Sequence, residues 1–237
     1  MKTFEDIKKH KRLGIIGGLD PETGFKFCLN INNRFKEITN IQPDIVLENL
    51  PISEKAEQEI IKGDVGEEHL LLLKKAVERM NHYHNQIDLI TIPCNTVHVF
   101  IDELRNRSRI PILSIIEECA LVCKEHKLMK IGLLASTKTI NERLHEKELE
   151  KQCIIVIKPK IDEQNKLSKI ILKIIKNETN EEDKEFVKNV INNMKQQGAE
   201  AIALGCTTFS LLIGKRDSPI PIIDSLEVLE NSALKFL

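Results

Sequence analysis

The sequence predicts an α/β fold with two pseudo-symmetric domains, each a mainly parallel sheet flanked by helices, and a site in the cleft between them. Two observations support this prediction. Short apolar segments alternate with longer amphipathic segments along the chain, as in proteins whose parallel strands are joined by helices. Three short motifs also recur in the same order in the second half of the chain. A repeat this long indicates a duplicated domain rather than a solenoid.

The predicted elements follow from the spacing of apolar residues. Strands are expected where short runs of β-branched and other apolar residues stand between turn-forming residues. These are Arg12–Ile16, Asp44–Leu47, Leu89–Pro93, Ile112–Ser114, Lys130–Leu134, Cys153–Ile157, Ala201–Leu204 and Ile222–Ile223. Helices are expected where apolar residues recur every three or four positions, for example over Glu67–Asn81, Val97–Arg105, Asp162–Ile175 and Glu182–Gln197.

The repeated motifs define the predicted division of the chain. Residues 13–17 resemble residues 131–135, Cys94 corresponds to Cys206, and the Ile-Pro-Ile at 110–112 recurs at 220–222. We therefore predict a first domain of residues 1–112 plus 215–237, which contains Cys94, and a second domain of residues 113–214, which contains Cys206.

Composition excludes several classes of protein. The chain has 237 residues, a formal net charge of -1 and 4% aromatic residues, which argues against nucleic-acid or membrane-surface partners. Its apolar runs are shorter than the roughly 20 residues that span a bilayer. Residues 1–12 are charged and lack the apolar core of a signal peptide. The six cysteines do not suggest a disulfide scaffold, so we expect reduced thiols in the cytoplasm.

The two repeated cysteines are the candidate reactive groups. Cys94 follows a predicted strand and precedes Asn95 and Thr96, which are favoured residues at helix starts, and Cys206 precedes Thr207 and Thr208. Free backbone N–H groups at such a position favour negative charge and can also hold a carboxylate. We therefore expect each thiol to ionise more easily than a free cysteine, whose pKa is roughly 8.5. Taken singly, either cysteine is better explained as a buried packing residue, and it is the duplicated pair at matching strand ends that favours a function.

Other motifs are less specific. The segment 11–24 is a strand that leads into a glycine-rich turn, but it lacks the spacing of dinucleotide-binding and P-loop motifs. His98 lies one helical turn after Cys94 and is either a base for that thiol or a packed structural residue. Cys119 and Cys123 lie four apart with no second pair at zinc-binding spacing, so we predict no metal site. No Schiff-base lysine context or phosphate-binding glycine loop stands out, so we predict no cofactor.

Together these segments resemble the aspartate/glutamate racemase family, whose members act without pyridoxal phosphate. The family motifs G-G-[ML]-G-P-x-x-T, P-C-N-T-x-H and G-C-T-E correspond to residues 17–24, 93–98 and 205–208 of this chain. Order, spacing and length agree over essentially the whole chain. The resemblance implies a pseudo-symmetric two-domain isomerase in which Cys94 and Cys206 are the acid and the base. Aspartate is the first expected substrate and glutamate the second, and D-amino-acid metabolism is the implied role.

The resemblance also implies a set of substrate-binding residues and a homodimer. Asn95, Thr96 and Thr207 match carboxylate- and amino-binding positions, Ser136 and Thr139 match hydroxyl positions, and Leu19 lies in the glycine-rich motif. A distal carboxylate needs a cation. Lys55 and Lys176 are the candidates, with Lys169 in the same stretch as Lys176.

Three residues depart from the family pattern. Asp20 replaces a glycine, Gly24 stands where threonine is frequent, with Thr23 as a substitute, and Thr208 replaces a glutamate. Asp20 either weakens the binding of an acidic substrate or turns away to cap the next helix. These departures leave two alternatives open. One is a lyase or isomerase of the same superfamily, similar to arylmalonate decarboxylase or maleate isomerase. The other is a binding protein for amino acids without catalysis.

Overall fold

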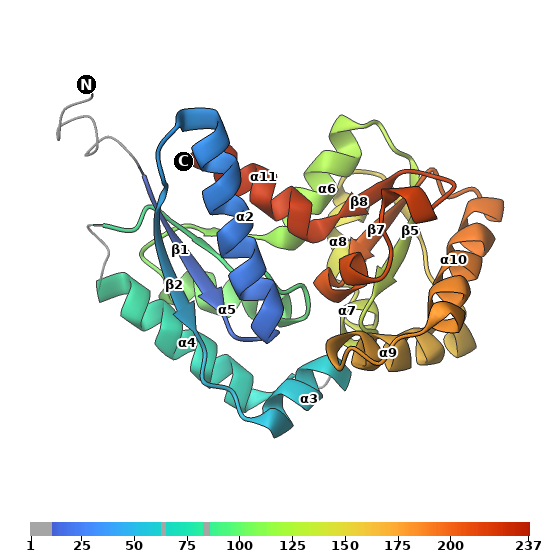
Figure 1. Ribbon diagram of the computed structural model, residues 1–237, viewed down its shortest axis with the longest axis horizontal. Coiled ribbons are helices and arrows are strands. Elements are labelled where there is room, and N and C mark those ends of the chain that lie inside the picture. The colour runs from blue at the N-terminus through green and yellow to red at the C-terminus, as the bar shows by residue number, and fades with distance from the viewer. Residues whose placement is uncertain (1–10, 63–64, 83–85) are drawn as a thin grey trace.

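Two four-stranded parallel sheets organise the chain (Figure 1). The computed structural model describes residues 11–62, 65–82 and 86–237, so most of the charged segment 1–12 lies outside the described residues. The first sheet has the order β2-β1-β3-β4, from Asp44–Asn49, Arg12–Gly17, Leu89–Thr91 and Ile112–Leu113. The second has the order β6-β5-β7-β8, from Ile155–Ile157, Lys130–Ala135, Ala201–Gly205 and Ile222–Asp224. Each predicted strand overlaps one of these.

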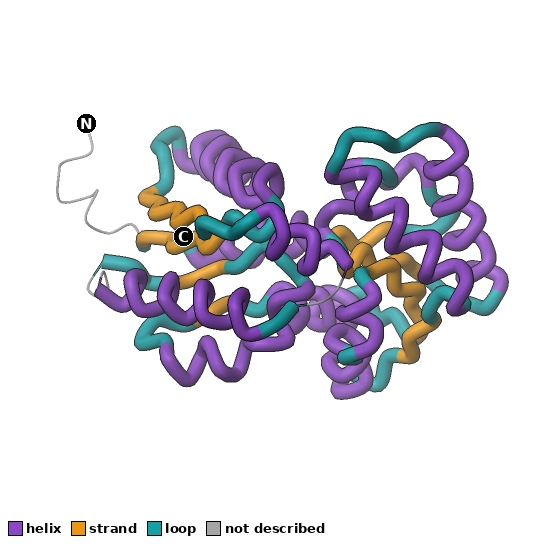
Figure 2. The backbone as a smooth tube through the Cα atoms, turned by 90° about the horizontal axis from the view of Figure 1, so that it is seen from below, coloured by secondary structure: helices purple, strands orange, loops and turns teal. Residues whose placement is uncertain are grey.

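The helices follow the predicted alternation (Figure 2). They are α2 (Pro21–Thr39), α3 (Glu54–Lys62), α4 (Glu67–His82), α5 (Ile101–Arg107), α6 (Ile115–Glu125), α7 (Thr137–Asn141), α8 (Leu144–Lys151), α9 (Ile161–Ile175), α10 (Glu181–Gln196) and α11 (Ser225–Phe236), with 3-10 turns η1 (Thr96–Phe100), η2 (Thr207–Leu211) and η3 (Lys215–Asp217). The predicted helix over Val97–Arg105 therefore begins as a 3-10 turn and becomes an α-helix only at Ile101.

The two sheets have the same topology, which confirms the predicted pair of α/β units. Strands β1 to β4 occupy the same positions in the first sheet as β5 to β8 occupy in the second. The repeated motifs lie in equivalent elements: residues 13–17 and 131–135 in the central strands β1 and β5, and Cys94 and Cys206 just after β3 and β7. Because all strand pairs are parallel, the ends of these strands lie on one edge of each sheet.

Two helices connect the units by packing across them. Helix α6 follows β4 of the first sheet, but its Cys119 and Cys123 are buried in an apolar cluster with Ile131 and Ala203 of the second sheet. Helix α11 follows β8 of the second sheet, but its Leu226, Leu229 and Ala233 pack with Leu13 and Ile15 of the first sheet. In Figure 1 both helices lie between the two sheets.

This crossing bears on the predicted division of the chain. The segment 215–237, assigned to the first domain from the sequence, contains β8, which pairs with β7 of the second sheet, and α11, which packs on the first. Glu230 of α11 accepts hydrogen bonds from Asn30 and Arg34 of α2, at 2.7 Å and 3.1 Å. The segment therefore contacts both units, and the exact domain boundaries remain a prediction.

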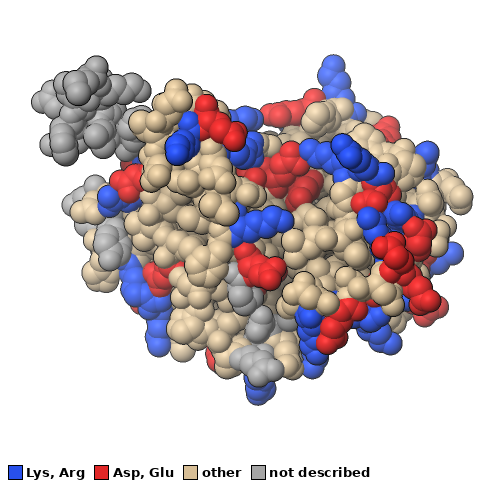
Figure 3. All heavy atoms as spheres, in the orientation of Figure 1, with Lys and Arg blue, Asp and Glu red and all other residues tan. Residues whose placement is uncertain are grey.

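On the side opposite to α6 and α11, helices α3 and α9 contact each other across the units (Figure 1). Lysine, arginine, aspartate and glutamate side chains are interspersed over the face in Figure 3, as the balanced composition leads one to expect. Among the described residues, no helix combines the length and apolar character needed to cross a membrane.

Gly18 is required by the turn between β1 and α2. Its φ of +86° is unfavourable for a residue with a side chain, and an added Cβ would lie 2.5 Å from the backbone nitrogen of Leu50. Gly18→Ala should therefore lower the free energy of unfolding by about 2 kcal/mol or more, measured by urea denaturation. Gly66→Ala is the matched control, because no atom lies within 4 Å of an added Cβ there. Equal stability of the two variants would contradict this account.

Candidate active site

A small pocket lies where the strand ends of the two sheets face each other. Its volume is about 30 Å³, close to the space that one water molecule occupies. Its walls come from the segments after β1, β3, β5 and β7 and from helices α3 and α9. The lining residues are Leu19 and Asp20, then Cys94, Asn95 and Thr96, then Ser136, then Cys206, Thr207 and Thr208, with Ile60, Ile171 and Ile175 from the two helices. Both repeated cysteines thus line one pocket, each from its own unit.

Cys94 is buried and meets the turn that follows it. The backbone N–H groups of Val97 and Thr96 donate to the thiol and lower its pKa, but burial has the larger effect and raises the pKa of Cys94 to about 12. The nearby Cys206 and Asp20 raise it further, because a thiolate at residue 94 would repel negative charge on either of them.

Cys206 lies in a similar environment, although it retains some contact with solvent. Burial raises the pKa of the Cys206 thiol and is the largest effect. Hydrogen bonds from the side chain and backbone of Thr208 lower this pKa, and the nearby Asp20 raises it. The expectation that both thiols ionise easily is therefore wrong for this closed pocket. The donors that the sequence suggested are present, but they do not offset the loss of water around the sulfur.

Asn95 connects three parts of the chain instead of capping the following turn. Its side chain makes no cap hydrogen bond. It accepts a hydrogen bond from Nε2 of His145 in α8, at 2.9 Å, and its Nδ2 donates to Ser225 Oγ at the start of α11, also at 2.9 Å. Asn95 is only 2% exposed. Burial lowers the pKa of His145 to about 3, so that histidine is neutral and its Nε2–H is the donor.

A second polar contact between the units lies beside Asn95. Thr96 Oγ1 is 3.1 Å from Ser136 Oγ, and Ser136 in turn donates to Thr139 Oγ1 at 3.0 Å. Ser136 caps the short helix α7 by accepting from the backbone of Thr139. Thr139 is fully buried behind Ser136 and does not line the pocket.

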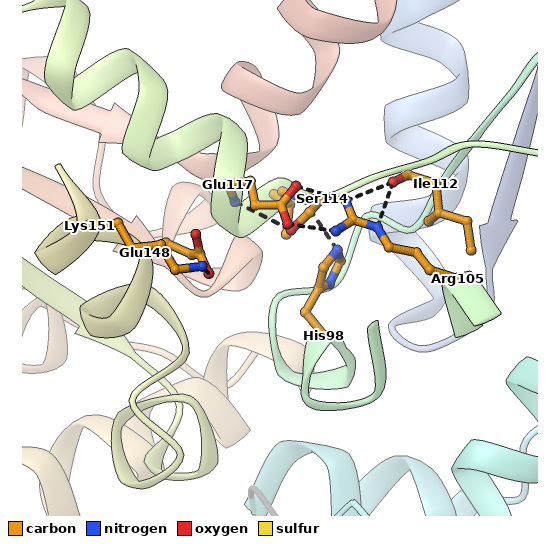
Figure 4. A network of polar contacts seen from close by, with 8 residues as sticks. His98, Arg105, Ile112, Ser114, Glu117, Glu148 and Lys151 are labelled. Carbon is orange, nitrogen blue, oxygen red and sulfur yellow. Dashed lines mark hydrogen bonds and ion pairs between the residues drawn. The ribbon is translucent and has the colours of Figure 1, made fainter. Parts of the chain in front are cut away.

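His98 anchors the turn that carries Cys94, and Figure 4 shows it near Arg105 and Glu117. Ile115 N–H donates to His98 Nε2 at 3.3 Å, so Nδ1 carries the proton and donates to the backbone oxygen of Cys94 at 2.7 Å. Burial lowers the pKa of His98 to about 4. Beside it, Arg105 makes a two-pronged ion pair with Glu117 at 2.6 Å and 2.7 Å and also donates to the backbone oxygen of Ile112. With both nitrogens engaged, His98 has the structural role and not that of a base.

The structure places the candidate lysines away from the pocket. The side chain of Lys55 is 86% exposed and lies 3.7 Å from Glu59 on the same helix. Lys176 is exposed at the end of α9, and Lys169 is exposed on the same helix. By contrast, Leu19 and Thr207 line the pocket and are buried. The expected cation for a distal carboxylate is therefore absent from the described lining residues.

Two of the three residues that depart from the family pattern, Asp20 and Thr208, are in contact with each other. Asp20 caps α2 by accepting hydrogen bonds from the backbone N–H groups of Glu22 and Thr23. Capping of this helix is one of the two roles predicted for Asp20 from the sequence. Its Oδ2 also accepts from Thr23 Oγ1 at 2.8 Å and from Thr208 Oγ1 at 3.4 Å. Gly24 packs on Gly17: an added Cβ would lie 3.1 Å from the Cα of Gly17, which leaves little room for a threonine.

Several residues of the site were not found from the sequence. His145 and Ser225 gave no signal, because a lone histidine or serine in a helix is unremarkable until its partner is known. Ile171 and Ile175 do lie at helical spacing within a predicted helix, but the side of the helix that faces a pocket depends on tertiary packing. Within the described part of the chain, no group of three or more His, Cys, Asp or Glu side chains is placed to hold a metal ion.

Two parallel α/β units with a thiol from each at a shared pocket define the class of protein: a two-unit enzyme fold with an inter-unit site. A model of the family described as Asp/Glu/Hydantoin racemase matches residues 16–233, and the chain belongs to that family.

Individual relatives agree with the family. The chain is 28% identical over 150 residues to the broad specificity amino-acid racemase RacX of Bacillus subtilis strain 168, a match that covers 62% of this chain and 64% of that protein. The chain thus spans less than two thirds of that relative's length. Among solved structures, a candidate Asp/Glu racemase from Yersinia pestis has a TM-score of 0.84 and 26% identity, covering 95% of this chain and 98% of that one. The Picrophilus torridus aspartate racemase has a TM-score of 0.79 and 26% identity, covering 95% and 94%.

The environment of Cys94 predicts slow alkylation. Because its pKa is raised to about 12, the thiolate fraction should rise about tenfold per pH unit from about pH 7 to about pH 10, without a plateau. The rate of iodoacetamide modification of Cys94 should rise with it, measured by mass spectrometry of peptides. The exposed Cys153 is the internal control and should react first. A plateau of the Cys94 rate near pH 8.5 would show an ordinary, accessible thiol instead.

Proposed function

We propose that this chain is a racemase of amino acids that needs no pyridoxal phosphate, with Cys94 and Cys206 as its two proton-transfer groups. One observation carries the proposal: two cysteines at equivalent strand ends line the same pocket from opposite units. Membership of the racemase family supports it. The name of the Bacillus subtilis relative, a broad specificity amino-acid racemase, supports a free amino acid as the substrate.

The reaction divides between the two thiols. One cysteine, as thiolate, takes the α-proton: the C–H bond breaks, its electron pair stays on the α-carbon, and an S–H bond forms. The other cysteine, as thiol, gives its proton to the opposite face of the carbanion and becomes the thiolate. The roles exchange for the reverse reaction. A thiolate whose thiol has a raised pKa is a stronger base than an ordinary one, which helps it to take so weakly acidic a proton.

The backbone N–H groups beside the thiols are the proposed stabilisers of charge. Those of Thr96 and Val97 point to Cys94, and those of Thr208 and Phe209 point to Cys206. Donors that are fixed before the reaction can stabilise negative charge that develops on the substrate carboxylate. Asn95, Thr96, Ser136 and Thr207 remain the proposed polar contacts of the amino and carboxylate groups. Thr139 would act through Ser136.

The pocket has to open for a substrate to enter. A volume of about 30 Å³ cannot hold an amino acid. We infer that α3 and α9, which contact each other across the pocket, separate for entry and close again to exclude water. Homodimerisation, predicted from the family resemblance, and the cytoplasm as the location remain proposals.

The function is tested by proton NMR in deuterated water with both enantiomers of a panel of amino acids, followed by chiral chromatography. Wild type should exchange the α-proton with inversion of at least one amino acid. Cys94→Ala and Cys206→Ala should each lower the rate of inversion by at least about 100-fold, since each removes one proton-transfer group. Cys153→Ala is the matched control and should keep the wild-type rate, because Cys153 is exposed outside the pocket.

The other outcomes separate the alternatives. Release of carbon dioxide would indicate a lyase similar to arylmalonate decarboxylase, and a shift of a double bond would indicate an isomerase similar to maleate isomerase. Tight binding of an amino acid without α-proton exchange would indicate a binding protein. Inversion that survives in both cysteine variants would overturn the two-thiol mechanism.

A further inference from the structure

We propose that the pocket selects amino acids whose side chain carries no negative charge, with Asp20 as the residue that excludes aspartate and glutamate. This inference rests on the proposed function and names the substrate class of that site. It departs from the aspartate and glutamate that the family resemblance suggested.

Asp20 is the charged residue of the pocket wall. It is the one acidic or basic side chain among the described lining residues, and its carboxylate increases the pKa values of both thiols. Its partners are neutral donors: two backbone N–H groups and the hydroxyl groups of Thr23 and Thr208. No ion pair with a lysine or arginine is found for it in the described parts of the chain. Its charge therefore acts on whatever enters the pocket.

No cation is placed to balance a second carboxylate. The described lining contains no lysine, arginine or histidine. On α3, Lys55 points into solvent beside Glu59 and Lys62 is exposed. On α9, Lys173 is paired with Asp183 at 2.9 Å, and Lys169 and Lys176 are exposed. Burying a carboxylate without a paired cation costs free energy, and a like charge nearby increases that cost.

The remaining walls favour an apolar side chain. Four apolar side chains line the pocket: Leu19, Ile60 of α3, and Ile171 and Ile175, which lie about one helical turn apart on α9. Ile60 and Ile171 are 5% and 2% exposed. They offer contacts to methylene and methyl groups and no hydrogen-bond donors to an acid.

A second negative charge on the substrate is disfavoured in either orientation of the substrate. A zwitterionic amino acid brings one ammonium and one carboxylate, which the Asp20 carboxylate and the backbone N–H groups near the cysteines can meet. Aspartate or glutamate brings a second negative charge for which no partner remains. Whether Asp20 faces the ammonium or the side chain, the additional carboxylate is the disfavoured group.

The decisive comparison uses substrates that differ in charge but hardly in shape. The rates of α-proton exchange in deuterated water are measured for asparagine against aspartate and for glutamine against glutamate, with leucine and methionine as apolar substrates. We expect kcat/KM at least about tenfold higher for each uncharged member of the two pairs. Binding is measured in parallel by the shift of the melting temperature with each amino acid, which requires no catalysis.

The role of Asp20 is tested with Asp20→Asn, since asparagine also caps helices well and removes the negative charge, while the hydroxyl groups of Thr23 and Thr208 can accept from its amide in place of donating. The ratio of kcat/KM for asparagine to that for aspartate should fall at least about tenfold in this variant. Asp162→Asn, which removes an exposed carboxylate from α9, is the matched control and should leave the ratio unchanged.

The outcomes distinguish this inference from the proposed function. Faster exchange of aspartate than of asparagine, with the cysteines required, would overturn the inference and leave the racemase standing. Melting-temperature shifts by uncharged amino acids alone, without exchange, would support the inference and overturn the racemase. No exchange and no binding by any amino acid would overturn both. An unchanged ratio in Asp20→Asn would remove Asp20 as the selecting residue.

Discussion

The arrangement of the candidate active site depends on the buried hydrogen bonds of Asn95. This residue follows Cys94 directly, and its amide is held by His145 of the second unit and by Ser225 at the start of α11. Apolar packing alone tolerates small shifts, whereas a buried hydrogen bond at 2.9 Å fixes both distance and direction. The contact also has a cost in folding free energy, because Nδ1 of His145 is buried without a hydrogen-bond partner. The position of one thiol relative to the other unit is thus set by polar contacts.

Helices α6 and α11 each follow a strand of one unit and pack on the other unit. This arrangement explains how the two units can share a pocket that still opens. These helices pack into the core of the opposite unit, so the units are joined on one side by apolar contacts that are costly to separate. On the other side α3 and α9 contact each other, and Ile60, Ile171 and Ile175 of these helices line the pocket. We expect opening on the side with the smaller contact. Closure would then raise the pKa of the thiols by removing water, as seen for Cys94, at the moment when the substrate is enclosed.

Most of the fold could be predicted from the sequence, because the spacing of apolar residues indicates helices and strands and the repeated motifs indicate two similar units. The recurrence of Cys94 at Cys206 is enough to predict both strand ends from the sequence. The electrostatics of the site could not be predicted in the same way. Free N–H groups suggested easily ionised thiols, but burial, which depends on the whole fold, outweighs them. Nor could the spacing of lysines show that Lys55 and Lys176 lie outside the pocket, since each helix has several faces that could carry them.

The central claim is that two separate groups handle the proton, one on each face of the α-carbon. The most direct test is the distribution of deuterium at low conversion, with one enantiomer of an accepted amino acid in deuterated water. Two thiols that do not share a proton predict a product enantiomer fully deuterated at the α-carbon, while the recovered substrate still carries its original hydrogen. Substantial hydrogen retained from substrate in the product enantiomer would show that a single group moves the proton across both faces, and would contradict the account.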